Sequence, residues 1–169
     1  NMKTIEENWE SITNAIRITT ELISSFGYNF QTLTSANALI PISYFILKLG
    51  NPTSFVQSER FKEDRNRIKQ WLIQSLLKRS FSGQPDSVLR PIRGILKDNT
   101  DGFPIEKIVN KFKGHAKSIV FSNDDIENLL IYRYGQSHIF SALALLYPTL
   151  DFRNRFHQDH IFPKSLFKR

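Results

Sequence analysis

Apolar residues return every three or four positions along most of this chain, which is the period of one face of an α-helix. The first such stretch begins after Thr4 and ends before Gly27, and its apolar members are Ile5, Trp9, Ile12, Ile16, Ile23 and Phe26. Six further stretches share the period, and the sequence has no sustained alternation of apolar and polar residues typical of a half-buried strand. The pattern predicts an all-α, irregular multi-helix bundle from about Thr4 to Tyr147.

Helix-capping and helix-breaking residues set the expected ends of these helices. The seven helices are expected at about 4–26, 39–49, 59–82, 85–97, from 104 onwards, 123–135 and 139–147. Thr4 with Glu7 has the spacing of a capping box, and Ser122 precedes the acids expected in a first helical turn. Pro41 either lies in the first turn of the second helix or kinks it, and Pro91 is expected to kink the fourth helix.

Composition limits the class of protein. The 169 residues contain no Cys, which excludes disulfides, thiolate zinc sites and a Cys nucleophile and is common in the reducing cytoplasm. No apolar run reaches the length of a membrane span, and the acidic first residues do not resemble a signal peptide. A cytoplasmic protein of one domain, or of one domain and a fragment of another, is expected.

The net charge of +7 is confined to two segments. Residues 107–117 contribute +4 through Lys107, Lys111, Lys113 and Lys117, without an acid. Residues 151–169 contribute +3, and the rest of the chain has 14 basic and 14 acidic residues. Clustered cations favour contact with a polyanion such as DNA, whereas the alternative for 107–117 is a solvated helix face.

The helical pattern ends near residue 150, and a dense group of titratable residues follows. Phe156 to Phe162 could form a strand, on which His157 and Asp159 would share one face and His160 would lie on the other. An imidazole and a carboxylate on one face suit a divalent metal ion, and a neighbouring His suits removal of a proton from water.

The run Asp159-His160-Ile161-Phe162-Pro163-Lys164-Ser165 resembles the first half of the HNH, or ββα-metal, endonuclease motif. The resemblance implies that Asp159 holds a Mg²⁺-type ion and that His160 is the general base that activates water for attack on a phosphodiester. The resemblance also implies that His157 is either a second metal ligand or a residue that supports a metal ligand. Arg153, Arg155 and Lys164 surround the motif and are expected to contact DNA.

The order of several shorter motifs resembles the helical middle region of the GmrSD-type family. These motifs are Asn37-x-x-Ile40-Pro41, Ile68-x-x-Trp71-Leu72, Phe81-Ser82-Gly83, Tyr134-Gly135 and Leu145-Leu146-Tyr147-Pro148. Such proteins are similar in plan to modification-dependent (type IV) restriction enzymes of phage defence. They join an N-terminal ParB/sulfiredoxin-like domain, which handles nucleoside triphosphate, to a helical middle and a C-terminal HNH nuclease.

Two departures from that plan lower the expected activity. The Asp-Gly-Gln-Gln-Arg signature of the family's N-terminal domain and a Walker-type loop are both absent, so no nucleotide hydrolysis is expected. The sequence ends at Arg169, before the second strand and helix that complete an HNH site. We therefore expect a helical domain at 1–150 and the start of an incomplete HNH domain at 151–169, catalytically inert and without tight metal binding. Its expected partners are DNA, with or without modified bases, and the rest of a parent chain.

Two other functions are compatible with the same residues. A non-catalytic helical module for protein interaction or DNA binding needs only the amphipathic helices. A structural metal site would join His157, Asp159 and His160 with His115 or His138, although His115 is expected to be exposed and His138 to be a helix cap or a satisfied core residue. Trp9 and Trp71 lie on apolar stripes and are expected in the core.

Overall fold

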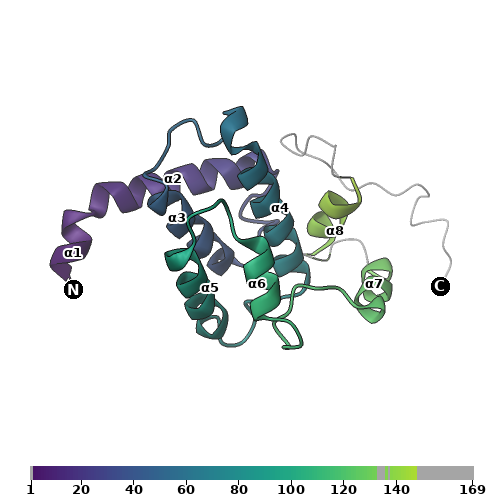
Figure 1. Ribbon diagram of the computed structural model, residues 1–169. Coiled ribbons are helices and arrows are strands. Elements are labelled where there is room, and N and C mark those ends of the chain that lie inside the picture. The colour runs from purple at the N-terminus through teal and green to yellow at the C-terminus, as the bar shows by residue number, and fades with distance from the viewer. Residues whose placement is uncertain (1, 133–135, 137, 148–169) are drawn as a thin grey trace.

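The computed structural model describes residues 2–132, 136 and 138–147 (Figure 1). The elements are α1 (Met2–Glu7), α2 (Trp9–Ser25), η1 (Ala36–Ala38), α3 (Leu39–Lys48), η2 (Glu59–Phe61), α4 (Lys62–Leu77), α5 (Asp86–Asp98), α6 (Ile105–Lys111), α7 (Asn123–Leu130) and α8 (Ile139–Leu146). No strand occurs in this part of the chain, so the predicted all-α class is confirmed for it. The predicted strand or loop that begins an HNH module, at 151–169, lies outside the described residues.

Helix α4 is the centre of the fold. It lies between α2, α3, α5 and α6 on one side and α7 and α8 on the other (Figure 1). Its residues Ile68, Trp71 and Leu72 are completely buried. The ring of Trp71 contacts that of Phe103 at a centroid distance of 5.5 Å and that of Phe81 at 6.1 Å. The prediction that Trp71 is a core residue is confirmed.

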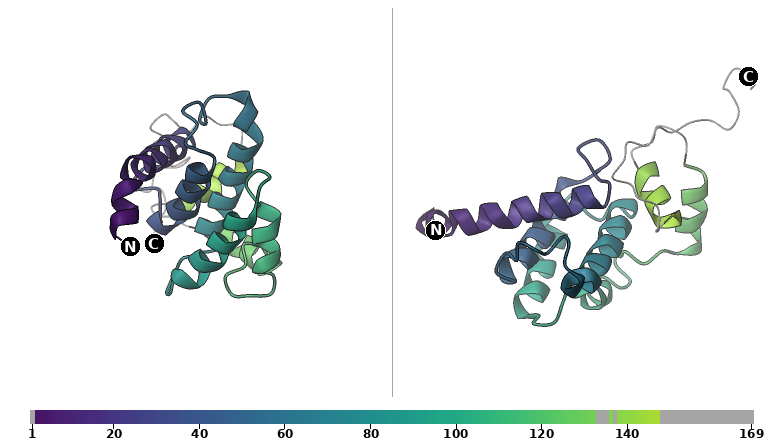
Figure 2. Two further views of the ribbon diagram at one scale, coloured as in Figure 1. Left: turned by 60° about the vertical axis from the view of Figure 1, so that its left-hand side comes forward. Right: turned by 90° about the horizontal axis from the view of Figure 1, so that it is seen from above.

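The first predicted helix is divided in two. Thr4 is the third residue of α1 and therefore does not cap it, and Asn8 separates α1 from α2, its side-chain amide donating to the carbonyl of Thr4 at 2.8 Å. Trp9 is 63% exposed, so the prediction that it belongs to the core is wrong. Its apolar stripe continues along α2, but α1 and the first turns of α2 extend beyond the neighbouring helices (Figure 2).

The predicted helix breakers act largely as expected. Pro41 lies in the first turn of α3, and that helix ends before Gly50 and Asn51, which both have positive φ. Pro91 lies inside α5. The Ser122 hydroxyl accepts from the Asp125 amide at 3.2 Å while the Asp125 carboxylate accepts from the Ser122 amide at 2.8 Å, which confirms the helix start at Ser122 as a capping box.

Helix α4 ends at Leu77, several residues before the expected end near Ser82. The chain turns at Arg79, whose φ of 49° lies in the left-handed region, and the amide of Ser80 donates to the carbonyl of Ser75 at 3.0 Å. This turn directs Phe81 back against Trp71, so Phe81 continues the apolar core without being helical.

No helix of the described segments is both long and apolar enough to cross a membrane.

Candidate functional site

The residues predicted to hold metal and activate water lie outside the described part of the chain. This applies to His157, Asp159 and His160, and likewise to Arg153, Arg155 and Lys164. Of the two other histidines considered as metal ligands, His115 is exposed after α6 and His138 precedes α8. Within residues 2–132, 136 and 138–147, no three His, Asp or Glu side chains gather in a way that could hold a metal ion.

The structure describes all four lysines predicted to contact DNA, and the ammonium groups of two of them donate hydrogen bonds to other residues of the protein. Lys107 lies on α6 and its ammonium group donates to the side chain of Asn99 at 2.7 Å. Lys117 lies in the loop after α6 and donates to the carbonyl of Ser82 at 2.6 Å. Lys111 and Lys113 are exposed, and no hydrogen bond or ion pair to them is seen among the described residues.

These contacts show how the lysines are distributed. Asn99 follows the last residue of α5, whereas Ser82 precedes its first residue, so the amines of Lys107 and Lys117 are held toward opposite ends of that helix. A helix of this length spans about 20 Å. Lys107 and Lys117 are therefore held apart and do not belong to one compact cluster of ammonium groups.

Helix α5 adds basic residues that the analysis of net charge missed. Arg90, Arg93 and Lys97 are all exposed and have the i, i+3, i+7 spacing of one helix face. Asp86 and Asp98 at the two ends of the helix reduce its net charge, which concealed this stripe when charge was counted by segment. Helical spacing applied to the basic residues alone would have found it.

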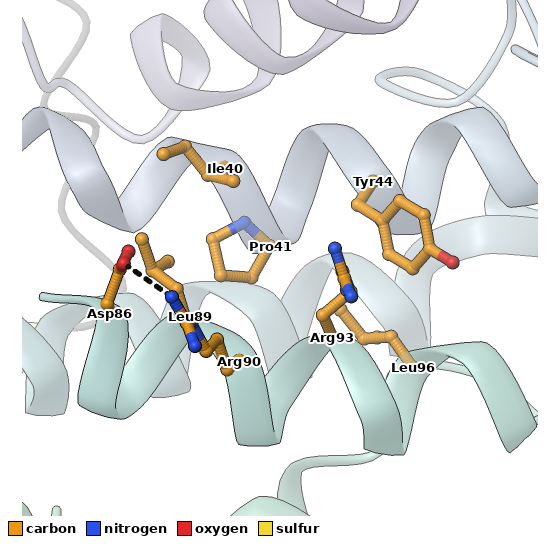
Figure 3. Close-up of a pocket in the computed structure, with 8 residues that line it drawn as sticks. All are labelled: Ile40, Pro41, Tyr44, Asp86, Leu89, Arg90, Arg93 and Leu96. Atoms are coloured by element: carbon orange, nitrogen blue, oxygen red, sulfur yellow. Dashed lines mark hydrogen bonds and ion pairs between the residues drawn. The ribbon is translucent and has the colours of Figure 1, made fainter. Parts of the chain in front are cut away.

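A pocket of about 270 Å³ lies between α3 and α5 (Figure 3). Its lining is mainly apolar, with Ile40, Pro41 and Tyr44 from α3 and Leu89 and Leu96 from α5. At its rim, the Arg90 guanidinium donates to the Asp86 carboxylate at 3.4 Å, and Arg93 lies beside the ring of Tyr44. This pocket can accept an apolar group, but Asp86 partly neutralises its positive rim.

Burial and charge change the pKa of few groups in the described chain. The Lys78 ammonium, helped by hydrogen bonds from Ser122, lowers the pKa of Asp125 to about 2. Burial raises the pKa of Tyr28 to about 12, although a hydrogen bond with Ser141 acts in the opposite direction. Burial, and to a smaller extent the charge of Arg79, lowers the pKa of His138.

Comparison with known proteins adds no assignment. No protein-family model matches the sequence, and no curated protein matches it either. The fold and the described surface define an all-α protein with basic residues on α5, on α6 and in the loop after α6.

Proposed function

We propose that this chain is part of a DNA-cleaving defence protein, comprising its helical middle region and the first half of a metal-dependent HNH endonuclease site. The observation that carries the proposal is the sequence from His157 to Ser165, which places a carboxylate and two imidazoles within four residues and has basic residues on both sides. A protein core has no need of such a grouping, whereas hydrolysis of a phosphodiester needs a metal ligand, a base and cations.

Each residue of the motif has a separate role in this proposal. Asp159 holds the divalent metal ion, which supplies charge stabilisation of the leaving oxygen when it is bound. His160, whose ordinary pKa is near neutrality, takes a proton from the attacking water. Arg153, Arg155 and Lys164 bind the phosphates next to the scissile bond.

The described surface supports the DNA-binding part of the proposal. Lys111, the last residue of α6, and Lys113, in the loop after it, are both exposed. Arg90, Arg93 and Lys97 add an exposed basic stripe on α5. Phosphates neutralised by such side chains release counterions, so binding of this kind is salt-dependent and nearly independent of base sequence.

The helical motifs support the same proposal in a weaker way. Ile68, Trp71 and Leu72 are buried together in α4, and Phe81 packs on Trp71. These four motif residues are therefore packing residues of the helical core and have no part in a chemical reaction.

The nuclease assignment can be tested in a longer protein that extends beyond Arg169. Metal-dependent cleavage of modified DNA should fall by about 10²- to 10⁴-fold in His160→Ala, because the general base is lost while the metal ligand remains. Asp159→Ala should lose both cleavage and metal binding. His115→Ala, an exposed histidine outside the motif, is the matched control and should cleave at the wild-type rate. Equal cleavage rates for His160→Ala and wild type would contradict the nuclease assignment. Cleavage of plasmid DNA by the 169-residue chain would contradict the proposal that this chain holds only half of the active site.

A second candidate function is a non-catalytic DNA-binding module, which the basic residues of α5 and α6 favour independently of the HNH motif. This function predicts salt-dependent binding of DNA without cleavage by the longer protein, with or without added Mg²⁺.

A further inference from the structure

A second pocket, of about 400 Å³, lies where three separate segments of the chain meet. The loop before η1, the end of α4 with the turn that follows it, and the start of α8 each contribute to its wall. The lining residues are Thr34, Ser35, Ser75, Leu76, Arg79, Phe81, Ser82 and His138. Four of these lining residues carry a hydroxyl group, and the others include one arginine and one histidine.

His138 supplies an unpaired nitrogen at this pocket. Its Nδ1 atom is buried and has no hydrogen-bond partner in the described structure, although the rest of the ring is only half-buried. Buried polar atoms without a partner are rare because each one loses its hydrogen bonds to water. Because Nδ1 has almost no accessible surface, a rotation of the ring would bring it to a ligand atom in the pocket, and that atom would give it the partner that the protein does not supply.

Arg79 supplies an uncompensated positive charge beside it. The side chain is exposed, and no carboxylate or other acceptor is seen bonded to it among the described residues. Its backbone has a φ of 49°, a left-handed conformation that disfavours residues other than Gly, Asn and Asp. Gly would be unstrained at this position, and backbone strain of this kind gathers at functional positions, so the strain is consistent with a use for the Arg79 side chain.

The hydroxyl groups and a nearby amine complete the environment. Ser82 belongs to the pocket wall, and its Oγ atom lies 3.4 Å from the ammonium group of Lys117. The carbonyls of Gln74, Ser75 and Leu76 at the end of α4 accept hydrogen bonds from the backbone amides of Lys78, Ser80 and Arg79, respectively, which reduces their repulsion of an anion. Positive charge and hydrogen-bond donors therefore dominate the site.

We propose that this pocket binds a phosphate group through Arg79 and His138, with the surrounding Ser and Thr hydroxyls as additional donors. A phosphate has at least two free oxygens, which matches the guanidinium of Arg79, the imidazole of His138 and the hydroxyl-bearing residues that line the same pocket. The pocket between α3 and α5 lacks this chemistry, since its lining is apolar and Arg90 is paired with Asp86. The proposal does not depend on the nuclease assignment, because none of its residues belongs to the HNH motif.

The test follows the imidazole signals of His138 by NMR in the 169-residue chain. One titration uses inorganic phosphate at constant ionic strength, and the other uses a single-stranded DNA oligonucleotide without terminal phosphates. Saturable shifts of the His138 signals are expected with inorganic phosphate. Arg79→Gln should weaken this binding by about tenfold or more, because it removes a charge-assisted hydrogen bond.

Two further variants distinguish binding from folding. Arg79→Gly keeps the left-handed turn without strain and should fold at least as stably as wild type, yet it should lose phosphate affinity as Arg79→Gln does. Arg17→Gln removes an exposed Arg from α2, outside both the pocket and the basic residues of α5 and α6, and should leave the affinity unchanged.

The two titrations also distinguish the sources of the phosphate group. A response to inorganic phosphate alone supports a site for a free phosphate or phosphomonoester, and a response to both ligands supports a site for the nucleic-acid backbone. The proposal is overturned if His138 responds to neither ligand, or if Arg17→Gln weakens binding as much as Arg79→Gln. Because DNA cleavage is not measured, failure here leaves the nuclease assignment intact, and failure of that assignment leaves this site intact.

Discussion

The ammonium group of Lys78 lies 2.5 Å from Oδ2 of Asp125 and joins the end of α4 to the first turn of α7. Both side chains are partly buried, at 19% and 27% exposed. The same carboxylate accepts from the backbone amide of Ser122 and so also closes the capping box of α7. Since α7 contains no fully buried residue and only Leu129 packs partly buried against the core, this carboxylate both starts the helix and helps to attach it to the core.

Replacing Asp125 should therefore loosen α7. Asp125→Asn removes the ion pair but keeps an oxygen that can accept from Ser122, and it should lower the free energy of unfolding by about 1 kcal/mol. Asp125→Ala removes both contacts and should cost about 2 kcal/mol, since loss of a cap is added. Urea unfolding at neutral pH measures both changes. Equal stability of the Ala variant and wild type would mean that the ion pair does not anchor α7.

Because of the Asp125 carboxylate, the free energy of unfolding should depend on pH under acidic conditions. Its pKa is about 2 in the folded chain against an ordinary value of 3.8, so the unfolded chain takes up the proton first as the pH falls. The stabilisation is fully present above about pH 4 and is lost as the pH falls through about 2. Asp125→Asn should lack this component, which a comparison of urea midpoints of the two proteins between pH 5 and pH 2 would detect.

Tyr28 and Ser141 should stabilise the contact between the segment after α2 and helix α8. Their hydroxyl oxygens lie 2.9 Å apart in a buried position, and the Tyr28 ring packs edge-on against Phe140 at 4.9 Å. Tyr28→Phe keeps the ring and should cost about 1 kcal/mol. With a folded pKa of about 12 against an ordinary 10.0, the wild-type protein should lose stability between these two values as the pH rises, and Tyr28→Phe should lose less. Parallel thermal unfolding curves over that range are the measurement.

The lysines near α6 should separate into binding and structural groups. Lys111→Gln with Lys113→Gln should weaken DNA binding and reduce its logarithmic salt slope by up to about 0.9 per lost phosphate contact, with little change in stability. Lys117→Gln should instead lower stability, because its ammonium group holds the carbonyl of Ser82. Fluorescence anisotropy at several salt concentrations, paired with urea unfolding, separates the two effects. Unchanged binding by the double variant would assign Lys111 and Lys113 to a solvated surface.

Two glycines should respond in opposite directions to the same substitution. Gly94 lies inside α5 with open space around an added Cβ, so Gly94→Ala should stabilise the protein by about 0.5–1 kcal/mol. Gly102 has a φ of 53°, and its Cβ would lie 2.8 Å from Oδ1 of Asp64, the atom that accepts from the amide of Phe103. Gly102→Ala should therefore destabilise it, and thermal unfolding of both variants would show the contrast.

The sequence predicts local features of this fold well, because they depend on neighbouring residues. The N-cap at Ser122, the stop after α3 and the buried face containing Trp71 all follow from spacing over a few residues, whereas the capping box predicted at Thr4 did not form. Trp9 was misplaced because helical period identifies an apolar stripe but not whether another element covers it. The hydrogen bonds of Lys107 and Lys117, and the meeting of Arg79 with His138, depend on residues distant in the sequence, so charge counting could not find them.

Pro91 divides the hydrogen-bonding of α5 into two parts. Proline has no amide hydrogen, so the bond from residue 91 to the carbonyl of Ser87 cannot form. Beyond it, Lys48 donates to the carbonyls of Leu96, Lys97 and Asn99 at 2.7, 2.7 and 3.1 Å and so fastens the C-terminal end of the helix to α3. The backbone amides after Pro91 should accordingly exchange with deuterated water more slowly than those before it, which would make α5 two regions that open on different timescales.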